Sequence, residues 1–213
     1  MYVHQRMTRR PVTVSPDYSV SKAYQIMTEG RYSQIPVVDS DNKLIGLVTE
    51  KLLAEVNPSS ATSLSVYEIN YLLSKTKVKD IMKTGIFKIE KDALLEDAAL
   101  IMKENRISSL PVVEGDYLVG IITRTDIFRA FIDIMGVKSK GTRIAISATD
   151  RTGVFAEITQ VFADLDIDIR NISNINENGT LEMIVKVRSF DVDKAIEELI
   201  AKGYTVESVK KIN

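Results

Sequence analysis

The most promising chemical groups in this sequence are a threonine and an aspartate three residues apart, Thr123 and Asp126. They follow a short apolar segment, 118–122, and precede an apolar stretch, 127–135, so a strand is expected to lead into a helix here. At such a junction, backbone N–H groups meet the positive end of the helix dipole, and this combination suits a phosphate. The Asp126 carboxylate could accept the two hydroxyls of a ribose, and the Thr123 hydroxyl can donate or accept.

The same two residues also fit a purely structural role. A threonine followed three residues later by an acid is the pattern of a capping box, in which each side chain bonds to the backbone N–H of the other residue. These residues alone do not decide between a ligand site and a helix cap.

Residues for catalysis or metal binding are sparse elsewhere. The single histidine, His4, has no acidic or cysteine neighbour in the sequence and is expected on the surface, and there is no cysteine. No Gly-x-Ser-x-Gly, Walker or histidine-pair motif occurs. The sequence therefore predicts a protein that is not an enzyme, with no metal, no cofactor and no disulfide.

The composition is that of an ordinary globular protein. Of 213 residues, 45% are hydrophobic and 27% are charged, and the net charge is −1. This balance argues against a nucleic-acid partner. No apolar run is long enough for a signal core or a membrane span, so we expect a cytoplasmic protein without a membrane partner.

An internal repeat organises the first two thirds of the chain. The segment Ile35-Pro36-Val37-Val38 returns 75 residues later as Leu110-Pro111-Val112-Val113. At offsets of 75 or 74, further matches follow: Met7 with Met82, Ala23 with Ala98, Met27 with Met102, Gly46 with Gly120, and Thr49 with Thr123. Such a register indicates two copies of one structural unit.

Each copy has the pattern strand, helix, strand, strand, helix, and the last third has a different one. We predict a first repeat at 1–56, a loop and linker helix at 57–77, and a second repeat at 78–137. A linker at 138–141 then leads to strands and helices in the order βαββαβ over 142–213, a ferredoxin-like unit. The fold class is thus α/β, or more strictly α+β.

The residues that carry these patterns resemble two known families. With their Leu/Ile-Pro-Val-Val strands and two Gly-x-x-Thr junctions, residues 1–137 are similar to a pair of CBS domains, a Bateman module. With the turn Asp150-Arg151-Thr152-Gly153 before an amphipathic helix, residues 140–213 resemble an ACT domain. The whole arrangement resembles the acetoin-utilisation regulatory proteins.

The CBS resemblance implies an adenosine ligand such as AMP, ADP, ATP or S-adenosylmethionine. Asp126 would hold the ribose hydroxyls, Thr123 would contact the ribose or the α-phosphate, and Arg124 could approach the phosphates. The adenine would lie between the strand at Thr84, Gly85 and Ile86 and the strand at Val112. Ordinary strand packing remains the alternative for Thr84 and Ile86.

The first repeat departs from the family pattern, because Leu52 stands where the second repeat has Asp126. An apolar side chain cannot satisfy two buried hydroxyls, and leaving them unpaired costs about 1–3 kcal/mol. We therefore expect an empty or weak first site and at most one tight nucleotide per chain.

The ACT resemblance implies that a small amino acid binds at a dimer interface, near Asp150, Gly153 and Val154. Backbone N–H groups at this helix start could take a carboxylate. The alternative is that Gly153 only permits the turn and that the domain serves for dimerisation.

Two functions of different classes remain open. In the first, the chain is a regulatory sensor of an adenosine ligand that forms a homodimer and acts on a partner enzyme. In the second, it is a ligand-independent dimeric scaffold with degenerate pockets.

Overall fold

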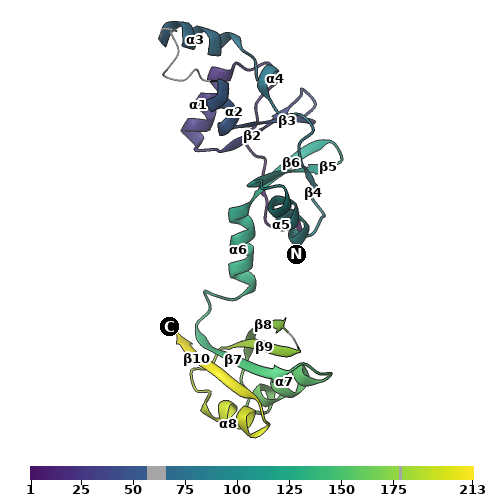
Figure 1. The fold of residues 1–213 in the computed structure, drawn as a ribbon, viewed down its shortest axis with the longest axis vertical. Helices are drawn as coiled ribbons and strands as arrows, with labels where there is room; N and C mark the ends of the chain where they lie inside the picture. The colour runs from purple at the N-terminus through teal and green to yellow at the C-terminus, as the bar shows by residue number, and fades with distance from the viewer. Residues whose placement is uncertain (57–65, 178) are drawn as a thin grey trace. The chain divides into compact units, whose positions relative to one another are not determined.

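The computed structural model describes residues 1–56, 66–177 and 179–213, with the side chains of all of these except Val56 and residues 66–70. The chain divides into two compact units, Met1–Ile127 and Phe128–Asn213, and the division falls inside helix α6 (Arg124–Ile134) (Figure 1). The loop predicted at 57–62 and residue 178 of the predicted hairpin turn lie outside the described residues.

The first unit contains both copies of the repeat. Its strands are β1 (Thr8–Arg9), β2 (Gln34–Val38), β3 (Leu44–Thr49), β4 (Ile89–Glu90), β5 (Ser109–Glu114) and β6 (Tyr117–Thr123). Its helices are the 3-10 turn η1 (Val3–Gln5), α1 (Val20–Gly30), α2 (Glu50–Val56), α3 (Val66–Lys75), α4 (Val78–Ile81), α5 (Leu95–Glu104) and the start of α6.

The two copies exchange the segments that lead into them. Strand β1 lies in the lead-in segment of the first copy, residues 7–12, and pairs antiparallel with β6 of the second copy, with Thr8 opposite Ile121. In the same way Lys83, in the lead-in segment of the second copy (82–87), forms an antiparallel bridge with Leu47 of β3. One sheet therefore has the order β1-β6-β5-β4, in which β1 comes from the first copy and the other three strands come from the second.

Two glycines make this exchange possible. A Cβ on Gly120 would lie 2.4 Å from Met7 Sδ and 3.0 Å from Thr8 O. A Cβ on Gly46 would lie 2.7 Å from Met82 Sδ and 3.0 Å from Lys83 O. The repeated Gly and Met positions in the sequence thus form one contact that occurs twice, between a strand and the lead-in segment of the other copy.

The apolar stripes seen in the sequence form the cores of the two copies. Helix α1 buries Val20, Ala23 and Met27, and α5 buries their counterparts Leu95, Ala98 and Met102. Helix α1 ends at a left-handed residue, Arg31 (φ 53°), whose N–H closes the last turn onto Met27 O.

The second unit has the predicted βαββαβ order. Its elements are β7 (Gly141–Thr149), α7 (Val154–Asp164), β8 (Ile169–Glu177), β9 (Thr180–Val187), α8 (Asp193–Ala201) and β10 (Thr205–Ile212). The sheet order is β10-β7-β9-β8. The helices pack on one face of the sheet, and the core between them includes Ile146, Leu181 and Met183 from the strands and Phe162 and Leu199 from the helices.

Helix α8 begins without a side-chain cap. Asp191 does not cap α8, because the helix begins at Asp193 and Val192 takes the N-cap position without a side-chain bond. The Asp191 N–H instead donates to Ser189 Oγ at 3.0 Å in the preceding turn.

Hydrogen bonds from side chains of the second unit hold the C-terminal end of α6 and the turn that follows it. Lys186 is almost fully buried and donates from Nζ to Gly136 O at 2.6 Å and to Val137 O at 3.3 Å. The Asn171 side-chain amide donates to Ile134 O. The bond to Ile134 O satisfies a carbonyl group in the last turn of the helix, and the bonds from Lys186 hold the turn that follows it.

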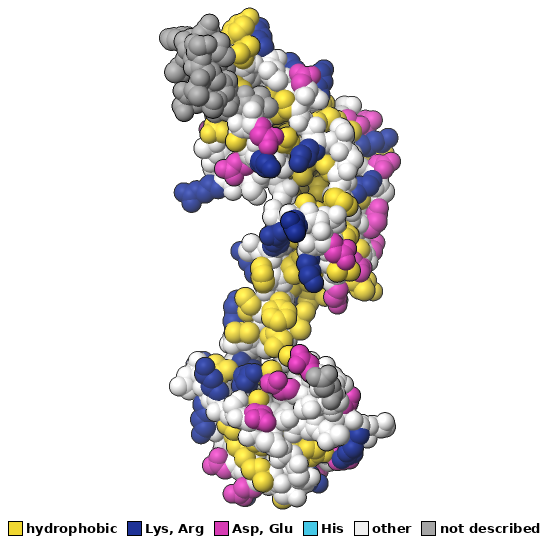
Figure 2. Space-filling view, viewed as in Figure 1, with side chains coloured by type: hydrophobic (Ala, Val, Ile, Leu, Met, Phe, Trp, Pro, Cys, Tyr) yellow, Lys and Arg dark blue, Asp and Glu magenta, His cyan; other side chains and the backbone are white. Residues whose placement is uncertain are grey.

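Most apolar side chains of α6 are exposed. Phe128, Phe131 and Ile134 are 65%, 59% and 51% exposed, and Ala130 is the helix's fully buried residue. Figure 2 shows hydrophobic side chains gathered over this helix. No helix among the described residues is long and apolar enough to span a membrane.

Candidate functional site

A pocket of about 450 Å³ lies where the lead-in segment of the first repeat meets the β6–α6 junction of the second. Its walls come from three places: the segment around β1, the turn between α1 and β2, and the ends of β5 and β6. The lining residues are Thr8, Arg10, Pro11, Val12, Arg31, Tyr32, Ser33, Gln34, Pro36, Ser108, Ser109, Ile121, Thr123, Arg124 and Thr125. All of them belong to the first unit.

Thr123 and Asp126 are brought together at the start of α6. The Thr123 N–H and hydroxyl both donate to Asp126 Oδ2, at 2.9 and 2.7 Å, and the Asp126 N–H donates to Thr123 Oγ1 at 3.3 Å. The capping interpretation is therefore confirmed. The cap holds an acceptor carboxylate and a hydroxyl, both half-buried, at the positive end of a helix beside the pocket.

Three arginines line this pocket. Arg124 opens α6 and is anchored by bonds from its N–H to Ser108 O and from Nε to Ile107 O, both 3.0 Å. Arg10 and Arg31 have left-handed backbones, with φ of 50° and 53°. Figure 2 shows Lys and Arg side chains gathered near the level where β6 leads into α6. Guanidinium groups stay charged at all ordinary pH values, so the pocket attracts anions.

Sequence reasoning missed Arg10, Arg31 and Tyr32. It did so because it assigned each lead-in segment to the site of its own repeat. The signal was present in the paired recurrence of Met7 with Met82 and of Gly46 with Gly120, which reports contacts between copies.

Thr84, Gly85 and Ile86 do not line the pocket beside Thr123. They follow Lys83, which bridges to Leu47 of the first repeat, and they lie outside any strand, with Gly85 at φ 63°. They are therefore placed beside Thr49, at the position in the first repeat that corresponds to the pocket beside Thr123. The strand that follows them, β4, begins at Ile89.

Val112 is fully buried within the second-repeat sheet, opposite Ile89 and Gly120. It does not line the described pocket. The CBS resemblance implied that the adenine would lie beside this strand, but the Val112 side chain packs into the core.

The first repeat has only half of the polar arrangement. The Leu52 N–H donates to Thr49 Oγ1 at 3.3 Å, which matches the bond from Asp126 to Thr123. Leu52 supplies no carboxylate in return.

His4 has an acidic partner that the sequence did not suggest. Its Nδ1 lies 3.2 Å from Asp92 Oδ1, and the 3-10 turn that carries it is anchored by Val3 N–H to Ala93 O at 2.9 Å. Among the described residues, no group of three or more His, Asp or Glu side chains is placed to hold a metal.

In the second unit, the turn before α7 is closed by its own bonds. The Val154 N–H, one of the expected carboxylate donors, donates to Arg151 O at 3.2 Å, and the Val154 side chain is buried. Gly153 has φ 91°, a conformation that requires glycine. Asp150 accepts from the Asn176 side-chain amide.

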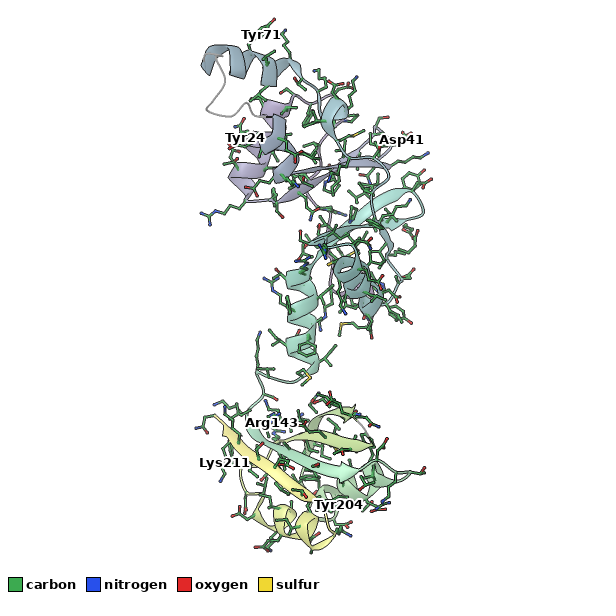
Figure 3. All side chains as sticks on the ribbon, in the orientation of Figure 1. Tyr24, Asp41, Tyr71, Arg143, Tyr204 and Lys211 are labelled. Carbon is green, nitrogen blue, oxygen red and sulfur yellow. The ribbon has the colours of Figure 1, made fainter. Side chains whose placement is uncertain are left out.

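A three-residue network fixes this turn to the rest of the unit. Arg151 donates both guanidinium nitrogens to the Glu157 carboxylate, at 2.7 and 2.6 Å. The Tyr204 hydroxyl donates to Glu157 Oε2 at 2.6 Å; Figure 3 labels Tyr204, which lies where α8 leads into β10. The bonds from Arg151 and then Tyr204 lower the pKa of Glu157 to about 2. Burial and the bond to Glu157 raise the pKa of Tyr204.

Comparison with known proteins matches both parts of the chain to families. The CBS domain model matches residues 3–57 and 78–133, and the ACT domain model matches residues 142–203. The chain is 37% identical over 150 residues to the chloroplastic protein CBSX1 of Arabidopsis thaliana, covering 62% of each chain. It is 31% identical over 139 residues to inosine-5'-monophosphate dehydrogenase of Methanocaldococcus jannaschii, covering 64% of this chain but 25% of that enzyme. The chain therefore spans less than two thirds of these relatives.

Solved structures share the fold. AcuB, an acetoin utilization protein of Vibrio cholerae, superposes with a TM-score of 0.55 at 29% identity, covering 65% of this chain and 95% of AcuB. CBSX2 of Arabidopsis thaliana in complex with AMP gives 0.53 at 30% identity, covering 62% and 97%. The CBS pair of MJ0100 with 5'-methylthioadenosine and S-adenosylmethionine gives 0.50 at 26% identity, covering 62% and 95%. This chain belongs to the CBS domain family, with two CBS domains followed by an ACT domain.

Proposed function

We propose that this chain is a regulatory sensor of adenosine ligands and that the ligand binds in the pocket beside Thr123 and Asp126. The observation that carries the proposal is a pocket of about 450 Å³ lined by Thr123 and three arginines. Asp126 does not line this pocket itself, but its carboxylate is bonded to the Thr123 hydroxyl at the pocket wall. The likeness to CBSX2 with AMP, and to the MJ0100 pair with two adenosine derivatives, supports this class of ligand.

In this proposal, Asp126 accepts the ribose hydroxyls and Thr123 contacts the ribose or the α-phosphate. Capping and ligand binding are compatible, because an ionised carboxylate can accept at about four lone-pair sites. The adenine packs against the apolar side of the pocket, where Pro11, Val12 and Ile121 lie. The lead-in segment of the first repeat thus takes the role that the sequence gave to Thr84, Gly85 and Ile86.

The proposal includes one tight nucleotide per chain. Leu52 occupies the position of the ribose-binding carboxylate in the other repeat, so the residues near Thr49 offer a ribose no equivalent acceptor.

Calorimetric titration of the intact protein with AMP, ADP, ATP and S-adenosylmethionine tests this assignment. The wild type should bind at least one of them at one tight site per chain, and Asp126→Ala should lose that binding. A ligand that binds the folded form also raises the melting temperature.

Asp97→Ala is the matched control, since Asp97 caps α5 by accepting from Leu94 N–H at 3.2 Å, away from the pocket. Both variants should lose about 0.5–2 kcal/mol of stability with the cap. Only Asp126→Ala should lose the ligand. If neither wild type nor variants bind any of the four compounds, the scaffold function stands instead.

We further propose that the chain acts as a homodimer on a partner enzyme. The exposed apolar face of α6 supports an interface with a second copy. For the ACT domain, the bonded turn at Val154 favours dimerisation over capture of an amino-acid carboxylate near Asp150 and Gly153.

A further inference from the structure

We infer that the pocket beside Thr123 selects adenosine ligands that carry phosphate, and that it discriminates against 5'-methylthioadenosine and S-adenosylmethionine. This inference rests on the proposed function and narrows its ligand class. It is carried by the charge of the pocket, by the contrast with the equivalent position in the other repeat, and by an unpartnered serine.

The pocket is lined by positively charged side chains and by no negatively charged one. Arg10, Arg31 and Arg124 line it, and its lining includes no aspartate or glutamate. Among the described residues, none of the three arginines forms an ion pair with an acid. Guanidinium groups bind phosphate oxygens in pairs of parallel hydrogen bonds, and the start of α6 adds the positive end of a helix dipole.

The equivalent position in the other repeat has a different charge. Arg124 corresponds to Glu50 and Arg10 corresponds to Gly85, whereas Arg31 is kept as Arg106. Because both repeats have the same backbone pattern, the fold itself does not require three arginines at one of the two places. Lys83 and Lys51 stand there in place of Thr8 and Thr125, so the equivalent position combines one guanidinium and two ammonium groups with the Glu50 carboxylate. The three guanidinium groups, with no acid among the lining residues, are on the side that also has Asp126.

A buried hydroxyl in the pocket wall lacks a partner. Ser109 is 4% exposed, lines the pocket, and has no hydrogen bond to Oγ among the described residues. It stands directly opposite Thr123 in the β5–β6 ladder, so both side chains are on the same face of the sheet. Its counterpart Gln34 does have a partner, because its Nε2 donates to Ser108 Oγ at 3.1 Å. Unpartnered buried polar atoms are unfavourable, and a polar ligand atom would satisfy this one once the Ser109 side chain turns toward the pocket.

The two classes of adenosine ligand differ in the charge that they bring to these arginines. AMP, ADP and ATP carry phosphate groups that are negative at neutral pH. S-adenosylmethionine carries a positive sulfonium next to the ribose, and 5'-methylthioadenosine carries no charge there. Beside three guanidinium groups, the phosphates are attracted and the sulfonium is repelled.

The test is a calorimetric titration of the full chain with adenosine, AMP, ADP, ATP, 5'-methylthioadenosine and S-adenosylmethionine at low salt. The best phosphate ligand should bind at least about tenfold more tightly than the two sulfur compounds, and added salt should weaken only the phosphate ligands. Arg31→Gln and Arg124→Gln should each weaken the phosphate ligand by about tenfold and leave adenosine unchanged. Ser109→Ala should weaken the phosphate ligand by a smaller factor.

Arg106→Gln is the matched control, because Arg106 has the same backbone conformation as Arg31 (φ 53° for both) and does not line the pocket. It should leave every affinity unchanged. Equal affinity for the sulfur compounds and for the phosphates, with no salt dependence, would overturn this inference and leave the adenosine-sensor function intact. Binding of none of the compounds would remove the sensor function itself.

Discussion

At the scale of single residues, Glu157 shows how one carboxylate can hold a turn in place. It accepts both guanidinium bonds of Arg151 and the hydroxyl of Tyr204, and thereby joins the turn before α7 to the start of β10. These bonds favour the ionised form of Glu157, and its pKa falls to about 2. Since the unfolded chain has no such bonds, the pKa of this group differs between the two states.

This difference predicts a pH-dependent contribution to stability. A folded-state pKa below the unfolded value stabilises the protein fully above the unfolded pKa of 4.5, and that stabilisation is lost as the pH falls towards about 2. The free energy of unfolding of the wild type should therefore fall more steeply between these pH values than that of Glu157→Gln. Denaturant titrations across this range measure both slopes.

Glu197→Gln is a suitable control, since Glu197 is exposed on α8. Its slope should match that of the wild type. Identical slopes for the wild type and Glu157→Gln would show that the bonds to Glu157 do not contribute to the free energy of unfolding.

At the scale of secondary-structure elements, the contact between β6 and the lead-in segment depends on a missing side chain. Gly120 allows Met7 and the Thr8 carbonyl to approach the strand closely, and β1 then pairs with β6. Strand β1 is only two residues long, so it has few other bonds to hold it there.

Gly120→Ala should therefore destabilise the first unit by about 1–3 kcal/mol, the usual cost of overpacking. Because the new methyl group would press first on Met7 Sδ, the double variant with Met7→Ala should lose less stability than the sum of the two single variants. Thermal or urea unfolding of the four proteins gives this coupling energy. Strict additivity would show that the two residues do not press on each other.

Most of these helices and strands could be predicted from the sequence, but not every pairing between strands. The repeat offset, the alternating strands and the helix stripes predicted both CBS repeats and the βαββαβ unit, because those signals are local. The pairing of β1 with β6 depends on residues more than one hundred positions apart, so no local pattern reports it. The candidate site was predicted in part for the same reason: Thr123 and Arg124 lie on it, whereas Arg10, Arg31 and Tyr32 were missed.

At the scale of the whole molecule, the exposed apolar face of α6 indicates a protein–protein interface. Phe128 and Phe131 are more than half exposed, and a single apolar helix face of this kind is unusual on a protein that stays monomeric. We expect a second copy of the chain to cover it.

The variant Phe128→Asp/Phe131→Asp should therefore shift the protein from the mass of two chains to that of one in light scattering after size exclusion. The introduced carboxylates cannot be buried at an apolar interface without a large desolvation cost. Phe190→Asp changes another exposed aromatic residue, 42% exposed, in a different part of the chain, and should leave the mass unchanged. A monomeric wild type would contradict the expected assembly.

The exchange of lead-in segments has one more consequence. A solitary copy of the repeat would have to borrow the missing segment from another molecule, and two such molecules would enclose two identical cavities. When both copies are joined on one polypeptide, the two cavities no longer have to be identical. A substitution in one cavity then leaves the other cavity unchanged. Here the divergence is visible in one pair of positions, where Asp126 stands on one side and Leu52 on the other.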